Sequence, residues 1–278
     1  MATITAAEVN KLRKQTGLGM MDCKKALVEA EGDFDKAIEI LRKKGQKVAE
    51  KRGDRDAAEG HVMAITNDAG NEGVILVLNS ETDFVANNQD FIDFATTIAN
   101  TALAAKADSK DAVNGLSLAD GRTIQEHVTD QIGKIGEKIE VSEYGYIAAE
   151  AVVAYNHPGN NIAALVGLSK NVDGVADAGK DVAMQIAAMA PVAIDADGVA
   201  QEVKDKELEI GREQAIQEGK PEQIVDKIAQ GKLNKFLKEN TLLTQDFIKD
   251  NKQSVAGYLK SIDKELTVTA FKRISIAK

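Results

Sequence analysis

The feature that most constrains the fold is a unit of two apolar runs, a polar turn and a helical segment, which occurs twice. The first copy combines residues 61–80, centred on "NDAGNEG", with a helical segment at 91–107. The second combines residues 146–169, centred on "NHPGNN", with a helical segment at 181–190. Turn-rich stretches between apolar runs are typical of β-hairpins. The repeat therefore predicts an α+β fold whose core consists of two related hairpin-plus-helix subdomains with antiparallel sheets.

Each predicted subdomain has a further segment of chain that can form a third strand. Residues 138–144 follow a helical segment in the first copy, and residues 266–277 can supply a strand to the second. Only 4% of the 278 residues are aromatic. Ala and aliphatic side chains must therefore fill the core, and Ala-rich stretches favour helix.

The N-terminal segment, residues 1–45, predicts three short helices. Thr5 and Glu8 have the T-x-x-E spacing of a capping box, which satisfies free N–H groups at a helix start. Asp33 is placed to cap the third helix. Residues 45–59 are charged, interrupted by Gly and poor in large apolar side chains. This composition indicates a tether with some helical content.

A highly charged segment at 199–240 predicts a protruding helical hairpin. Gly219 suits the end of the first helix and Pro221 the start of the second. Two long antiparallel helices of this kind are usually an interaction arm or a spacer. The expected division is residues 1–54, the three-helix module and tether; 55–145, the first core subdomain; 146–198 with 241–278, the second; and 199–240, the arm.

The charge distribution bears on the kind of partner. The formal net charge is −9, which argues against a nucleic acid or an anionic membrane as the main target. Residues 1–52 carry +4 and the remainder −13, which indicates either a two-sided grip on one protein partner or an ordinary solvated surface. The single cysteine, Cys23, excludes an internal disulfide. Without a signal peptide or a membrane-length apolar run, we expect a soluble, cytoplasmic protein.

One motif resembles a catalytic element. Residues 174–180, "GVADAGK", match the spacing of a phosphate-binding loop. Asp181 stands where Ser or Thr should hold Mg²⁺, and a carboxylate there would repel phosphate. We therefore expect a Gly-containing loop in which Asp181 favours a helix start. His61, His127 and His157 show no short ligand spacing, so we predict no catalytic site, metal or cofactor.

The two copies differ most in the loop after the hairpin. Residues 169–179 form a plain loop, "SKNVDGVADAG". Residues 80–90 instead read "SETDFVANNQD", which places Asp83 beside Phe84. Because the second copy has no aromatic residue here, the fold alone does not require one. Phe84 either plugs a seam of its subdomain, with Asp83 capping a turn, or forms an exposed wedge of the kind found at binding hot spots.

Three segments resemble bacterial elongation factor Ts. Residues 12–45 are similar to the N-terminal signature of that family, and "ETDFVANN" at 81–88 is similar to its second signature. The arm, with "QEGKP", and the following "LLTQDFIKD" at 242–250 also match, so the resemblance covers essentially the whole chain. It implies a guanine-nucleotide exchange factor that promotes GDP release from elongation factor Tu during translation elongation. Such a factor is not itself an enzyme and binds no nucleotide.

The resemblance also implies functional residues. The wedge would push between two helices of elongation factor Tu and displace its Mg²⁺ coordination, and it falls on Thr82, Asp83, Phe84 and Val85. The N-terminal module resembles a ubiquitin-associated fold, and its positions that engage the nucleotide domain fall on Leu12, Arg13, Met20, Met21 and Lys24. In the second subdomain, His157 of "NHPGN" matches a contact histidine.

The implied partner is elongation factor Tu, in its GDP-bound and nucleotide-free states, with no direct contact to nucleic acid or membrane. Pairing of the 199–240 arm with a second copy, as a homodimer, is an open alternative. Two rival functions also remain. One is an interaction scaffold with a ubiquitin-associated-like head, which has no need to expose Phe84. The other is an enzyme that binds nucleotide through residues 174–180, and binding of GTP or GDP by the isolated protein would favour it.

Overall fold

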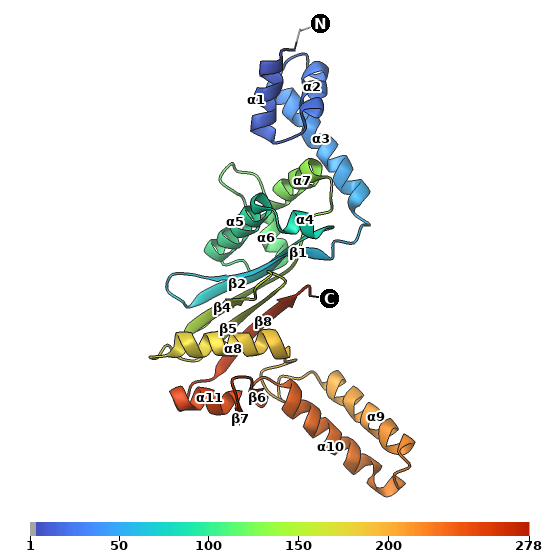
Figure 1. The fold of residues 1–278 in the computed structure, drawn as a ribbon, viewed down its shortest axis with the longest axis vertical. Coiled ribbons are helices and arrows are strands. Elements are labelled where there is room, and N and C mark those ends of the chain that lie inside the picture. The colour runs from blue at the N-terminus through green and yellow to red at the C-terminus, as the bar shows by residue number, and fades with distance from the viewer. Residues whose placement is uncertain (1–3, 278) are drawn as a thin grey trace. The chain divides into compact units, whose positions relative to one another are not determined.

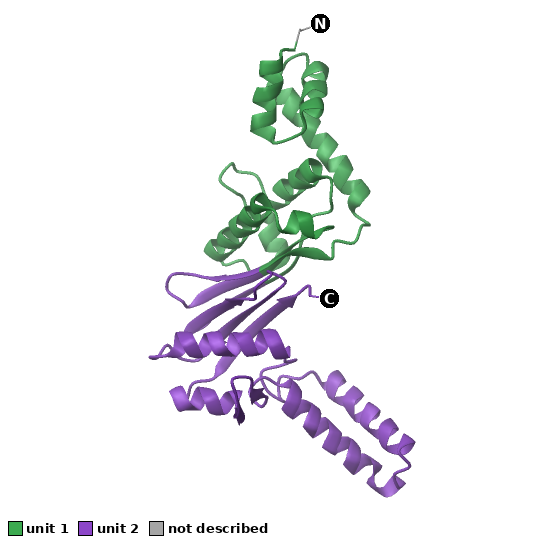
Figure 2. Ribbon diagram, viewed as in Figure 1, with its two compact units in different colours: residues 1–62, 76–144, 278 green, residues 63–75, 145–277 purple. Residues whose placement is uncertain are grey.

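The computed structural model describes residues 4–277, and the chain divides into two compact units (Figure 2). One unit holds the residues up to 62 together with 76–144, and the other holds 63–75 together with 145–277. The sequence-based division kept the whole first hairpin within 55–145. Hydrogen bonds explain the difference, because the carbonyls of Gly70 and Asn71, in the hairpin turn, accept from backbone N–H groups of residues 149–152.

The first unit begins with the expected three-helix module: α1 (Ala6–Thr16), α2 (Met20–Glu29) and α3 (Phe34–Arg52) (Figure 1). The capping box of Thr5 and Glu8 starts α1. Gly17, with φ +69°, ends it in the left-handed conformation that glycine adopts without strain. The Asp33 side chain accepts from the Lys36 N–H at the start of α3. The small apolar core of the module consists of Val9, Leu12, Cys23, Ala26, Leu27, Ala30, Ala37 and Leu41.

The helix α3 is longer than the sequence suggested. It continues to Arg52, so the first half of the segment expected to be a tether is helical. The cause is packing against α7 (Ile124–Ile135), where Gly45 of α3 is buried. A Cβ atom on Gly133 of α7 would lie only 2.8 Å from the Gly45 Cα atom. Two glycines therefore let the helix backbones meet, and this contact extends α3 beyond its local sequence signal.

A three-stranded sheet with the order β1-β2-β3 follows the module. It consists of β1 (Glu59–Thr66), β2 (Glu72–Ser80) and β3 (Glu140–Ala148), which confirms the third strand. Besides α7, the chain between β2 and β3 forms α4 (Asp83–Ala86), α5 (Gln89–Ala105) and α6 (Lys110–Gly115). In α5, Phe91, Ala95 and Ile98 are buried on one helix face, whereas Phe94 is half-buried.

The second unit contains the second copy. Its antiparallel sheet has the order β4-β5-β8, formed by β4 (Ala151–Asn156), β5 (Ile162–Leu168) and β8 (Val268–Ser275). α8 (Val175–Met189) shares a core with this sheet and with α11 (Val255–Ile262). A short ladder pairs β6 (Asp246–Phe247) with β7 (Asp250–Ser254). Both copies are therefore hairpin-plus-helix units, as the repeat predicted.

The arm is a helical hairpin of α9 (Gln201–Gln217) and α10 (Glu222–Asn240), as expected (Figure 1). Gly219, with φ +69°, turns the chain, and Pro221 directly precedes α10. The two helices approach closely at Gly211, where an added Cβ would lie 3.0 Å from the Ala229 Cα. The buried residues of the two helices are all small or aliphatic, and Arg212 of α9 pairs with Asp226 of α10 at 2.7 Å at the exposed edge of the contact.

Candidate functional site

The most exposed large apolar side chain of residues 4–277 is Phe84, which is 86% exposed. It lies on α4, a single turn between β2 and α5. Ala86, on the other side of the turn, is buried, whereas Val85 is half-buried and Asp83 is exposed. The interpretation of Phe84 as a plug within its own subdomain is therefore wrong. α4 uses Ala86 as its inward contact and presents the aromatic ring to water.

The start of α4 is held by two neighbouring carboxylates. Glu137 accepts from the Thr82 backbone N–H at 3.1 Å and from the Thr82 hydroxyl at 2.8 Å. Glu81 accepts from the Lys138 N–H at 2.7 Å and from the Arg52 guanidinium at 2.9 and 3.0 Å. The Lys138 hydrogen bond, and then the charge of Arg52, hold the pKa of Glu81 below its usual value. The carboxylate therefore stays ionised and keeps accepting at neutral pH.

The end of α4 is closed by its own chain. The backbone N–H and the side-chain amide of Asn87 both donate to the Asp83 carbonyl at 2.9 Å. Asn88 then starts α5, because its side chain accepts from the Asp90 N–H at 2.9 Å. The two asparagines of "ETDFVANN" thus terminate one helix and begin the next. This leaves Phe84 on a short, closed turn rather than on a long loop.

The N-terminal module presents a second exposed apolar surface, on α2. Met20 and Met21 are 51% and 64% exposed, and Lys24 and Arg13 are exposed near them in sequence. Val28, 57% exposed, extends the same helix and was missed by the sequence analysis. Its position seven residues after Met21 is the signal that would have found it, since i and i+7 share a helix face.

Leu12 does not belong to this exposed surface. Its side chain is fully buried in the core of the module, with Val9 and Leu27. Val9 and Leu12 are three residues apart on α1 and are both buried, as expected for one face of a helix. We therefore correct the assignment made by resemblance, because a fully buried side chain has no surface to offer a partner.

In the second unit, His157 is exposed in the turn between β4 and β5. The Tyr155 hydroxyl lies 3.0 Å from the His157 Nδ1 atom, and the His157 N–H donates to the Ile162 carbonyl at 2.9 Å. The backbone hydrogen bond closes the turn, and only the Tyr155 contact involves the ring. The site residues expected from the sequence therefore fall on separate elements: α4, the module and this turn.

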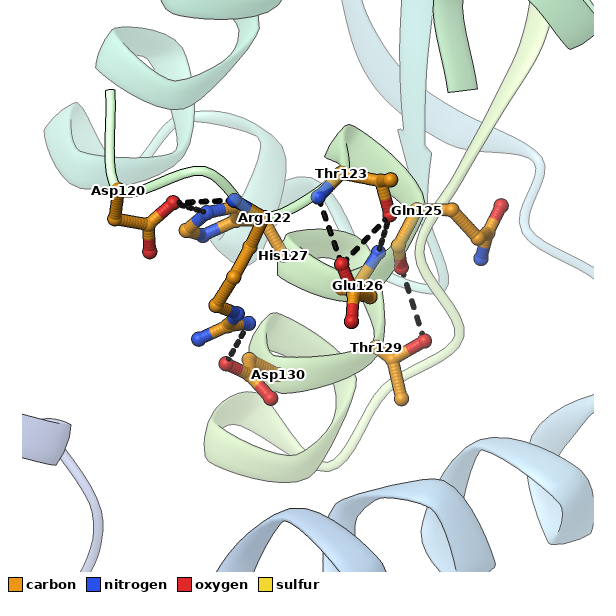
Figure 3. Close-up of polar contacts among 8 residues, drawn as sticks. All are labelled: Asp120, Arg122, Thr123, Gln125, Glu126, His127, Thr129 and Asp130. Atoms are coloured by element: carbon orange, nitrogen blue, oxygen red, sulfur yellow. Dashed lines mark hydrogen bonds and ion pairs between the residues drawn. The ribbon is translucent and has the colours of Figure 1, made fainter. Parts of the chain in front are cut away.

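A further polar cluster, which the sequence did not indicate, lies before and along α7 (Figure 3). The His127 ring lies 3.0 Å from Asp120, and Arg122 pairs with Asp130 at 2.5 Å. The hydrogen bond from His127, and then that from the Arg122 N–H, lower the pKa of Asp120. These side chains line a polar cavity of about 380 Å³ together with Gln15, Arg42 and Lys134. Its lining carries both basic and acidic side chains.

The motif "GVADAGK" is not a phosphate-binding loop. α8 begins at Val175, so most of the motif is helical and Gly179 is buried within the helix. Asp181 is in the second turn of α8 rather than at its start, and it accepts from the Tyr258 hydroxyl at 2.9 Å. The expected loop was therefore wrong, because Gly174, with φ +80°, already ends the preceding loop.

Among residues 4–277, no three or more His, Cys, Asp or Glu side chains gather as metal ligands would. Nor does any helix there combine the length and apolar content that crossing a membrane requires.

Comparison with known proteins identifies the class. Residues 81–278 match the family model described as elongation factor TS. Elongation factor Ts of Christiangramia forsetii is 56% identical over 276 residues, which cover 99% of this chain and 100% of that relative. The corresponding protein of Amoebophilus asiaticus is 54% identical over 275 residues (98% and 99%), and that of Cytophaga hutchinsonii is 50% identical over 279 (100% and 100%).

The fold and these matches define an elongation factor of protein synthesis. The chain belongs to the elongation factor Ts family.

Proposed function

We propose that the protein accelerates the release of GDP from elongation factor Tu by inserting the wedge, residues 82–85, into that GTPase. The observation that carries this proposal is the 86% exposure of Phe84 on a turn whose start is held by Glu137 and Glu81. Burying an aromatic ring on docking contributes about 1.5–3 kcal/mol. A ring that is already exposed and already positioned can deliver that energy to a partner.

The energetic task is to weaken a tight nucleotide complex. A GTPase that binds GDP at nanomolar affinity holds it by about 12 kcal/mol. A protein that binds the nucleotide-free GTPase best must, by linkage, weaken nucleotide binding by the same factor. Linkage alone does not lower the barrier to release. We therefore assign that task to Phe84, which moves between two helices of the GTPase and disturbs its Mg²⁺ coordination.

The other expected contacts supply binding energy rather than the distortion. Met20 and Met21 present flexible apolar side chains on α2, and Arg13 and Lys24 add positive charge. Methionine-rich surfaces adapt to a partner with little strain. His157, fixed at its turn, contacts another domain of the GTPase. The protein makes and breaks no covalent bond in this process, so it is not an enzyme.

The test is the release of labelled GDP from elongation factor Tu, measured with the parent protein and with Phe84→Ala. We expect the parent to accelerate release and Phe84→Ala to lose about tenfold or more of the maximal rate, the size of a binding hot spot. Because the ring is exposed, the melting temperature should not change. Equal rates with both proteins would refute the wedge, and binding without acceleration would favour the scaffold.

A further inference from the structure

We propose that Glu137 and Glu81 are positioning residues of the wedge, and that Arg52 ties them to the helix that carries the N-terminal module. The proposal rests on the proposed function, because it explains how Phe84 is held ready for insertion. We call the five residues involved the wedge brace; they are Arg52, Glu81, Thr82, Glu137 and Lys138. All five lie within the first unit.

A brace is needed because α4 is too short to hold its own geometry. α4 has four residues, and an isolated helical turn is unstable in water. Thr82 occupies its N-cap position but turns its hydroxyl to Glu137, at 2.8 Å, instead of to the first turn of α4. The orientation of the turn is therefore set by contacts outside it.

The contacts form a matched pair between two chain segments. Thr82 donates twice to Glu137, whereas Glu81 accepts from the N–H of Lys138. Adjacent residues of one segment thus bind adjacent residues of the other in both directions. Gly136, with φ +81°, ends α7 and turns the chain so that Glu137 and Lys138 reach the wedge. A two-residue clamp of this kind fixes direction as well as distance.

The brace also reaches the N-terminal module. Arg52, the last residue of α3, donates to both oxygens of Glu81. The same helix packs against α7 where Gly45 meets Gly133, and Leu41 lies in the core of the module. One helix thus joins the module to the base of the wedge.

The wedge brace affects the local order of α4 more than the folding stability of the whole protein. Arg52 and Glu81 have side-chain exposures of 34% and 15%, and partly exposed ion pairs contribute little to folding. Preorganisation, in contrast, acts directly on binding, because a turn that is already ordered loses less entropy on docking. Removal of the brace should therefore loosen the wedge while the fold persists.

The experiment compares Glu137→Ala with Lys170→Ala, which removes the ion pairs of Lys170 with Asp263 and Glu265 at the equivalent loop of the second copy. The maximal rate of GDP release and the concentration for half-maximal release are measured for each. We expect Glu137→Ala to lower the maximal rate about tenfold, the effect of losing hydrogen bonds to a charged group. Lys170→Ala should leave it unchanged.

Conservative variants separate positioning from simple damage. Thr82→Ser keeps both hydrogen bonds to Glu137, so it should retain the parental rate. Thr82→Val keeps the backbone N–H bond and loses the hydroxyl bond, so its rate should fall between the parental rate and that of Glu137→Ala. In a Phe84→Ala background, Glu137→Ala should have no further effect, because Glu137 acts only through the ring. Additive losses from Phe84→Ala and Glu137→Ala would overturn the proposal, and so would a parental rate for Glu137→Ala.

A partner-free measurement separates this inference from the proposed function. Amide hydrogen exchange at Ala86 and Asn87, whose N–H groups donate to Thr82 and Asp83, reports whether α4 is closed. Exchange there should accelerate about tenfold in Glu137→Ala and not in Lys170→Ala. Unchanged exchange would refute the brace even if Phe84→Ala slows GDP release. If Phe84→Ala releases GDP normally but exchange still accelerates in Glu137→Ala, the proposed function fails and the brace remains.

Discussion

The loops that follow β2 and β5 occupy the same place in the two copies and are built differently. After β5, Val172 packs against the core of the second unit, and Lys170 pairs with Asp263 and Glu265. After β2, the chain inserts the extra turn α4 and turns Phe84 outward. Both loops are tied down by charged side chains at their base. Only the first exposes an aromatic ring, so that exposure is not a requirement of the fold.

The difference separates two roles that a loop residue can have. The side chain of Val172 is directed inward and contributes to folding, whereas Phe84 is directed to water and contributes nothing to the core. A residue that the fold does not use, and that is nevertheless held in place, is a candidate for binding.

The largest effect is expected from removing the wedge. Replacing residues 82–85 with Gly-Ser-Gly-Ser should reduce accelerated GDP release by about 100-fold or more, because ring and brace are lost together. The matched control makes the same replacement at residues 170–173, where stability should fall and the folded protein should still accelerate release. Stopped-flow release of labelled GDP measures both. If the replacement at residues 170–173 abolished accelerated release and the replacement at residues 82–85 did not, the roles assigned to the two loops would be wrong.

A large effect on stability is expected at the contact that extends α3. Gly133→Ala should destabilise the protein by about 1–3 kcal/mol, because the new methyl group would lie 2.8 Å from the Gly45 Cα. Gly231→Ala, in α10, has open space around the new methyl group and should stabilise it by about 0.5–1 kcal/mol. Denaturant unfolding followed by circular dichroism gives both values. Equal changes in the free energy of unfolding for the two variants would mean that the close contact of Gly45 with Gly133 does not hold α3 against α7.

A smaller, reciprocal effect separates Val172 from Phe84. Val172→Ala should cost about 1 kcal/mol of folding stability, since the side chain is only partly buried, and leave GDP release unchanged. Phe84→Ala should change stability by less than about 0.5 kcal/mol, as exposed substitutions usually do. Thermal unfolding and GDP release, measured on the same two preparations, test this. The comparison fails if either variant alters both quantities.

The smallest effect concerns His61, a buried residue of β1 whose counterpart in β4 is Ala151. Burial lowers the pKa of His61, so the unfolded chain binds a proton more readily than the folded protein. The contribution of neutral His61 to the free energy of unfolding is therefore complete above the ordinary pKa of about 6.5. That contribution is lost as the pH falls below this value. Unfolding of the parent and of His61→Ala between pH 7 and pH 5 should show a weaker acid dependence in the variant. An identical dependence would contradict the assignment.

Much of the fold follows from short-range signals. The apolar spacing of α5, the capping box of Thr5 and the turn at Gly219 are all encoded within a few residues. These signals fix helix ends and hairpins because caps and turns depend on local backbone geometry. Comparing one repeat with the other singled out Asp83 and Phe84 as well, but it left an inward ring and an exposed wedge both open.

The features that were missed depend on distant residues. α3 runs past Gly45 because of Gly133, and the wedge is held by Glu137, 55 residues along the chain from Thr82. No local pattern marks Glu137 as a partner of the wedge. The exposure of Phe84 is a tertiary property too, since the sequence allowed an inward ring equally well.

Insertion of the ring into elongation factor Tu can be followed at position 84 itself. The chain contains no tryptophan, so Phe84→Trp made with 5-fluorotryptophan places one fluorine in the whole protein, once GDP release shows that the variant is active. In the free protein the fluorine resonance should shift between H₂O and D₂O, because the side chain is exposed. On the nucleotide-free complex with elongation factor Tu, we predict that this solvent shift disappears. A complex in which the fluorine still reports contact with water would contradict insertion of the ring.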